Sequence, residues 1–76
     1  MPKIQPLPWQ KLARVFELDA WTPVRTKGDH IAYVKAGCSR PVIIPKWKEA
    51  AVFIIKNNLK TAEMSRERYF ELLEKV

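Results

Sequence analysis

The first stretch of the chain carries apolar residues at the spacing of an amphipathic helix. Its apolar positions recur at intervals of three and four: Trp9, Leu12, Val15 and Phe16. Such residues share one face of a helix, while Lys11 and Arg14 fall on the other. Pro8 suits a helix start, since its missing N–H costs nothing there. We therefore expect a helix from about Pro8 to Asp19 or Ala20.

Three short extended segments follow, separated by turn and loop residues. Residues 22–26 and 30–35 read as strands on either side of a turn at residues 27–29, where glycine and aspartate supply the dihedral angles and hydrogen bonds of a tight turn. Residues 36–40 read as a loop, and residues 42–44 as a third strand enclosed by two prolines. The pattern predicts an antiparallel meander.

Helical spacing returns in the last third of the chain. Val52, Ile55 and Leu59 begin one helix, and Ser65 suits the N-cap of another. The apolar residues of that last helix are Tyr69, Phe70, Leu72 and Leu73. The order of helix, three strands and two helices predicts an α+β fold with its helices on one face of the sheet and the other face open to solvent or a partner. A length of 76 residues predicts a single domain over residues 1–76.

Positive charge is concentrated in the middle of the chain. The formal net charge is +6, of which residues 19–48 carry +4, while residues 49–76 are neutral. The central cations are Arg25, Lys27, Lys35, Arg40, Lys46 and Lys48. Such a concentration is typical of a surface that binds a polyanion, most commonly RNA. A solvated surface without a ligand is the alternative.

The only histidine, His30, directly follows the predicted turn. An imidazole is the side chain best able to exchange protons near neutral pH. In RNA, a base that deprotonates the 2′-hydroxyl promotes its attack on the adjacent phosphorus. His30 can serve as that base or as the acid for the leaving oxygen, with Arg25, Lys27 or Lys46 stabilising the charge that develops. Gly28 would let the backbone approach a phosphate closely. Alternatively, His30 occupies the turn without a chemical role.

The cysteine content and the apolar runs bear on metal binding, on membrane insertion and on the compartment of the protein. One histidine and one cysteine, Cys38, predict neither a metal site nor a cofactor, and a lone cysteine fits a reducing compartment. The longest uncharged apolar run, residues 50–55, is too short to cross a bilayer, and the first residues lack the apolar core of a signal peptide. We therefore expect a cytoplasmic protein.

Aromatic residues add a candidate contact for RNA or for a partner protein. Trp47 stands between Lys46 and Lys48, a pattern that suits base stacking or a hot spot of a partner interface. Plain packing is the alternative and the favoured prediction. For Tyr33, cross-strand packing is the favoured prediction over base stacking. Trp9 and Trp21 are expected in the core.

Several segments, taken in order, resemble the HicA family of toxin–antitoxin toxins, which are mRNA interferases. The resemblance covers roughly residues 8–73 and rests on five pieces: Ala20-Trp21 after the first helix, the turn at 25–30, the strand at 40–45, and segments 54–59 and 64–73. It implies a double-stranded-RNA-binding-domain-like fold, a helix–three-stranded sheet–helix unit, here with an extra C-terminal helix.

The resemblance also implies a function. It predicts metal-independent cleavage of mRNA by His30, restraint by a HicB-like antitoxin, and no DNA binding by the chain on its own. Candidate RNA contacts are Arg25, Lys27, Gly28, Lys35, Lys46 and Lys48, with Trp47 a candidate partner contact. A non-catalytic RNA-binding module of the same fold is the alternative. The chain departs from many members at Ala20, where they carry glycine, and at Trp47, where they carry a second histidine.

Overall fold

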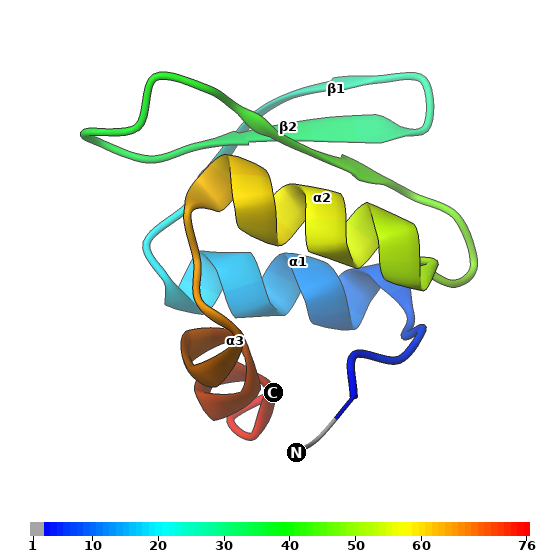
Figure 1. The fold of residues 1–76 in the computed structure, drawn as a ribbon. Helices are drawn as coiled ribbons and strands as arrows, with labels where there is room; N and C mark the ends of the chain where they lie inside the picture. The colour runs from blue at the N-terminus through cyan, green and yellow to red at the C-terminus, as the bar shows by residue number, and fades with distance from the viewer. Residues whose placement is uncertain (1–2) are drawn as a thin grey trace.

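The computed structural model describes residues 3–76 and has the α+β architecture that the sequence predicts (Figure 1). Its elements are α1 (Trp9–Leu18), β1 (Thr22–Lys27), β2 (His30–Val34), β3 (Val42–Pro45), α2 (Val52–Ala62) and α3 (Arg66–Leu73). All the predicted helices and strands are present, with small shifts at their ends. Helix α1 begins one residue after Pro8, and β1 extends into the expected turn as far as Lys27.

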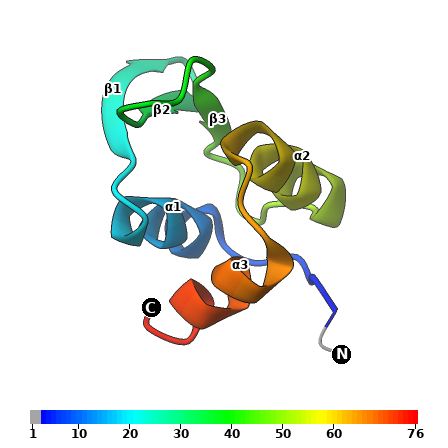
Figure 2. The ribbon, with the colours of Figure 1, turned by 60° about the vertical axis from the view of Figure 1, so that its left-hand side comes forward.

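The three strands form the predicted antiparallel meander, in the order β1-β2-β3. The helices lie on one side of this sheet, and no helix of the described chain covers the other side (Figures 1 and 2). Ile31, Tyr33, Val42 and Ile44 are buried, as expected for the strand positions that face the helices. Alternate positions face away, and of these His30, Val34 and Ile43 are exposed whereas Ala32 and Pro45 are buried. We call this second side the open face.

The core lies between the sheet and the helices. Leu12, Val15 and Phe16 of α1 are fully buried, as the periodicity of the first helix predicts. Tyr69 of α3 is also fully buried, and burial raises the pKa of its hydroxyl to about 12. Trp21 is buried in the core as expected, while Trp9 packs against it from a partly exposed position.

Helix α1 is followed, after its C-cap Asp19, by a residue in the left-handed conformation, Ala20, with φ at 70°. The Ala20 N–H donates to the Glu17 carbonyl and the Trp21 N–H donates to the Phe16 carbonyl, at 3.1 and 3.0 Å. The rings of Phe16 and Trp21 also meet edge to face, with centroids 6.0 Å apart. This arrangement is a Schellman motif with its usual apolar contact. Glycine is favoured at such a position because it lacks a Cβ. The motif therefore gives a physical reason for the glycine that many HicA members carry where this chain has Ala20.

Replacing Ala20 with glycine is expected to stabilise the fold by about 1 kcal/mol, because the left-handed conformation strains an alanine more than a glycine. In a domain of this size, that raises the Tm by about 4–8 °C. Thermal unfolding followed by circular dichroism measures the change. The control is Ala13→Gly within α1, where the same substitution should lower the Tm. A Tm for Ala20→Gly at or below that of the wild type would contradict the interpretation.

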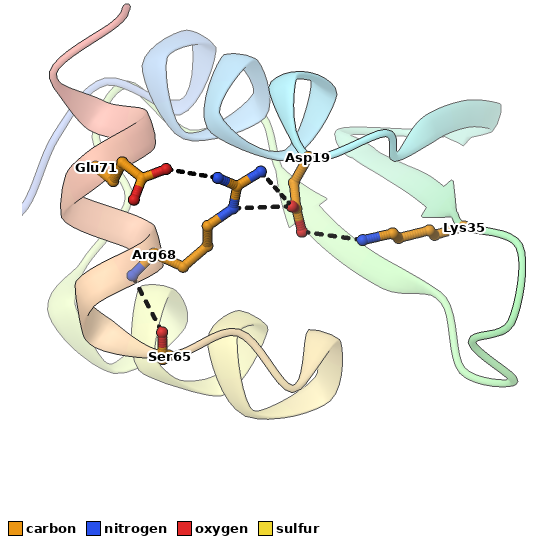
Figure 3. A network of polar contacts seen from close by, with 5 residues as sticks. All are labelled: Asp19, Lys35, Ser65, Arg68 and Glu71. Carbon is orange, nitrogen blue, oxygen red and sulfur yellow. Dashed lines mark hydrogen bonds and ion pairs between the residues drawn. The ribbon is translucent and has the colours of Figure 1, made fainter.

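A network of charged side chains joins the end of α1 to β2 and α3 (Figure 3). The Asp19 carboxylate accepts from the Lys35 ammonium at 3.3 Å through one oxygen, and from the Arg68 guanidinium at 3.2 and 3.3 Å through the other. Arg68 also pairs with Glu71 at 2.7 Å. The predicted N-cap is present at the start of α3, where the Ser65 hydroxyl accepts from the Arg68 N–H at 3.1 Å. The Arg68–Asp19 pair links α3 to the end of α1, while Tyr69 and Leu72 pack α3 into the core.

Candidate active site on the open face

The β1–β2 hairpin places His30 at the first position of β2. Lys27 and His30 are paired across the two strands, so that only Gly28 and Asp29 form the turn. Gly28 has φ at +60°, which suits the first central position of a two-residue hairpin turn. A Cβ added there would meet no atom within 4 Å, so the backbone conformation, and not a lack of space, accounts for the glycine. The predicted approach of a phosphate to Gly28 stays a prediction.

The Asp29 carboxylate connects the imidazole of His30 to the indole of Trp47. His30 Nδ1 lies 2.8 Å from Asp29 Oδ1, and Trp47 Nε1–H donates to Asp29 Oδ2 at 3.1 Å. The two rings lie edge to face, with centroids 6.4 Å apart. A carboxylate at Nδ1 favours the tautomer that carries its proton there, which leaves Nε2 as the acceptor available to a substrate.

The sequence interpretation missed Asp29 as a site residue. One signal was available, because an aspartate directly precedes the histidine inside a two-residue turn. The contact with Trp47 had no such signal, since the two residues are 18 positions apart. It depends on the pairing of β2 with β3, which sets His30 opposite Pro45, and on the Lys46 N–H, which donates to the Asp29 carbonyl.

Two of the predicted RNA contacts lie beside the imidazole. A depression of about 300 Å³ on the open face is lined by Arg25 and Lys27 of β1, His30 and Ala32 of β2, and Ile43 of β3. The cations and the imidazole therefore border one hollow, which we call the β1 depression. Its charge suits an anionic group, and His30 is placed to exchange a proton with that group.

The other predicted RNA contacts, Lys46, Lys48 and Lys35, do not line the β1 depression. The Lys46 ammonium lies 5.6 Å from the centroid of the Trp9 ring, at the start of α1, and Lys48 is exposed just beyond Trp47. Lys35 is not brought together with His30, because its ammonium pairs with Asp19 in the network described above. Tyr33 is buried, and its hydroxyl donates to Glu17 at 3.4 Å. Burial, with Glu17 adding to it, raises the pKa of Tyr33, in keeping with the predicted packing role.

Two further properties concern ligands and membranes. Within residues 3–76, no three side chains of histidine, cysteine, aspartate or glutamate come together in a group that could hold a metal ion. None of the helices in the same part of the chain has the length and apolar character that a membrane crossing needs.

The fold and the family comparison together define the class of this protein. A family model described as the HicA toxin of bacterial toxin–antitoxin systems matches residues 9–64, more than half of the chain. The protein is therefore a toxin of a toxin–antitoxin system. It belongs to the HicA toxin family, as its sequence motifs predict, and this membership implies a cognate antitoxin as partner. Searches of curated proteins and of solved structures find no match.

Proposed function

We propose that this toxin is a metal-independent endoribonuclease that binds and cleaves mRNA in the cytoplasm and uses His30 as its one catalytic imidazole. The observation that carries the proposal is the position of that imidazole. His30 is held by Asp29 at Nδ1, is about half exposed at 48%, and borders a depression with Arg25 and Lys27. Geometry of this kind suits proton transfer at a bound phosphodiester.

The reaction would follow from the chemistry of RNA. His30 Nε2 takes the proton of a 2′-hydroxyl, and the 2′-oxygen forms a bond to the adjacent phosphorus. The bond from phosphorus to the 5′-oxygen then breaks, and that oxygen takes a proton from the imidazolium or from water. Arg25 and Lys27 stabilise the charge that grows on the phosphoryl oxygens. The products are a 2′,3′-cyclic phosphate and a 5′-hydroxyl.

The proposal predicts cleavage that does not need a divalent metal ion. Purified toxin incubated with a synthetic RNA and excess EDTA should cut at the rate seen without chelator, because imidazole and fixed cations supply the chemistry. The 3′ ends, analysed by mass spectrometry, should carry a cyclic phosphate or its hydrolysis product, a 3′-phosphate. Activity that disappears with EDTA and returns with magnesium would refute the mechanism.

RNA binding on the open face is the second component of the proposal. The charged contacts predict that RNA affinity falls steeply as salt rises. Lys27→Ala should lower the slope of log Kd against log salt by about 0.7–1, the loss of one phosphate contact. Fluorescence anisotropy with a labelled RNA measures this slope. Lys35→Ala is the matched control, because its ammonium already pairs with Asp19, and should leave the slope unchanged.

These measurements separate catalysis from binding alone. Salt-dependent binding without any cleavage would favour the alternative, an RNA-binding module of the same fold. Equal slopes for the wild type and Lys27→Ala would show that the β1 depression is a solvated surface.

The antitoxin completes the proposal. We propose a HicB-like protein with an acidic surface that covers His30 and the neighbouring cations, because opposite charges speed and orient association. Trp47 is 43% exposed and is the candidate anchor of that interface. The bound antitoxin would then exclude RNA from the open face.

A further inference from the structure

A second depression borders His30 on the side of β3 and α2. Its volume is also about 300 Å³, and its lining includes His30, Ile43, Trp47, Ile54 and Asn58. We call it the β3–α2 pocket. His30 and Ile43 also line the β1 depression, so the imidazole stands between the two hollows.

Asn58 is a polar residue on the buried face of α2, where apolar residues are expected. It is 6% exposed and is the only amide or charged side chain buried among the described residues. Helix α2 presents it beside the buried Ile55 and Leu59. Its Nδ2 is buried and has no hydrogen-bond partner in the structure. A buried donor without a partner is costly. The Trp21 indole N–H and the Tyr69 hydroxyl also lack a partner, but only Asn58 lines the β3–α2 pocket next to the candidate catalytic residue. Nδ2 itself is covered, so rotation of the side-chain amide is the movement that would turn its N–H groups toward a ligand in that pocket.

The two depressions differ in the chemistry that they offer. The β1 depression holds Arg25 and Lys27, which suit a phosphate. Among the described residues, neither a lysine nor an arginine lines the β3–α2 pocket, which instead offers apolar side chains, an indole and neutral amides. Proteins read unpaired RNA bases with such groups, stacking them on aromatic rings and donating hydrogen bonds to their edges.

We propose that the β3–α2 pocket holds the nucleobase next to the scissile phosphate and that Asn58 Nδ2–H donates to an acceptor on the edge of that base. The phosphate then lies over Arg25 and Lys27, with His30 between base and phosphate. All four bases carry acceptors, so the preference beside the cut follows from the shape of the pocket together with the direction in which Asn58 donates. This inference rests on the RNA cleavage proposed above and adds the specificity of the site.

The first test observes Asn58 directly and does not need cleavage. The probes are four hexanucleotides that differ in one central base and carry 2′-O-methyl groups, which remove the attacking hydroxyl. Side-chain amides are few, since the chain has only Asn57, Asn58, Gln5 and Gln10. In ¹⁵N-labelled wild-type toxin, the Asn58 amide and the Trp47 indole signals should shift together, with one base binding about fivefold or more tightly than the others.

Three results would overturn the inference. The Asn58 signal could stay unmoved by all four probes, or all four could bind with equal affinity. Inorganic phosphate alone could also reproduce the shift, which would make the pocket an anion site. One further result would contradict the proposed catalysis but not the proposed base pocket. If the probes bind with a base preference while unmodified RNA is not cut, catalysis is refuted and the base pocket stands.

The second test removes the donor. Asn58→Leu keeps the branched shape of the side chain and replaces a buried donor that has no partner, so the Tm should be equal to or above that of the wild type. Affinity for the preferred hexanucleotide should fall about fivefold, to the level of the other three. Gln10→Leu removes an exposed amide on α1, outside the pocket, and should change neither affinity nor preference. A base preference that survives in a folded Asn58→Leu variant would also overturn the inference.

Discussion

The His30→Ala variant is expected to lose RNA cleavage by a factor of about 10²–10⁴, the usual contribution of general acid–base catalysis. The sequence contains no second histidine that could take over the proton transfer. Its expression should therefore no longer inhibit growth. Cleavage of a fluorescently labelled RNA under single-turnover conditions measures the loss, and colony counts after induction measure the effect in cells.

The same variant should remain folded. The His30 side chain is 48% exposed on the open face and does not belong to the buried core. Its Tm should therefore stay within a few degrees of the wild type's, and it should still bind the cognate antitoxin. Wild-type cleavage by a folded His30→Ala protein would remove His30 from the mechanism, and the proposal would fail with it.

The Asp29→Ala variant is expected to show the second largest loss, about tenfold or more, within the 10²–10⁴-fold that acid–base catalysis supplies in total. Asp29 contacts the imidazole, so we expect it to act as a positioning residue. Without its carboxylate, nothing in the described structure holds Nδ1, and Trp47 loses the acceptor for its indole N–H. The loss should fall on kcat, with little change in KM, because Arg25 and Lys27 remain in place.

The tautomer of His30 shows whether Asp29→Ala loses activity because the imidazole is no longer held or because the structure is disturbed. The chain has one imidazole, so its ¹⁵N chemical shifts can be assigned without ambiguity. In the wild type the proton should reside mainly on Nδ1, and in Asp29→Ala it should redistribute toward Nε2. Trp47→Phe, which removes the indole donor to Asp29 and keeps an aromatic ring, should cause a smaller loss of kcat. An unchanged tautomer together with unchanged kcat would show that Asp29 serves only the turn.

The amino-acid sequence determined the elements and their order because both depend on local patterns. The spacing of Leu12, Val15 and Phe16 fixes a helix with one buried face, and turn residues and alternation fix the strands. The sequence also predicted a turn of residues 27–29 before His30, and the structure narrows it to Gly28 and Asp29, which pairs Lys27 with His30. The motifs were likewise sufficient to predict the HicA family.

Only the tertiary structure decided which side chains share a site. The contact of Trp47 with Asp29 depends on the pairing of β2 with β3, and Lys35 meets Asp19 because α1 packs under the sheet. Charge alone grouped Lys35 with Lys27, although the Lys35 ammonium pairs with Asp19 and only Lys27 borders the imidazole. Asn58 lies one residue before the apolar Leu59, but whether its amide has a partner depends on every element packed around it. Local periodicity specifies the faces of helices and strands, whereas contacts between distant residues follow from how those faces pack.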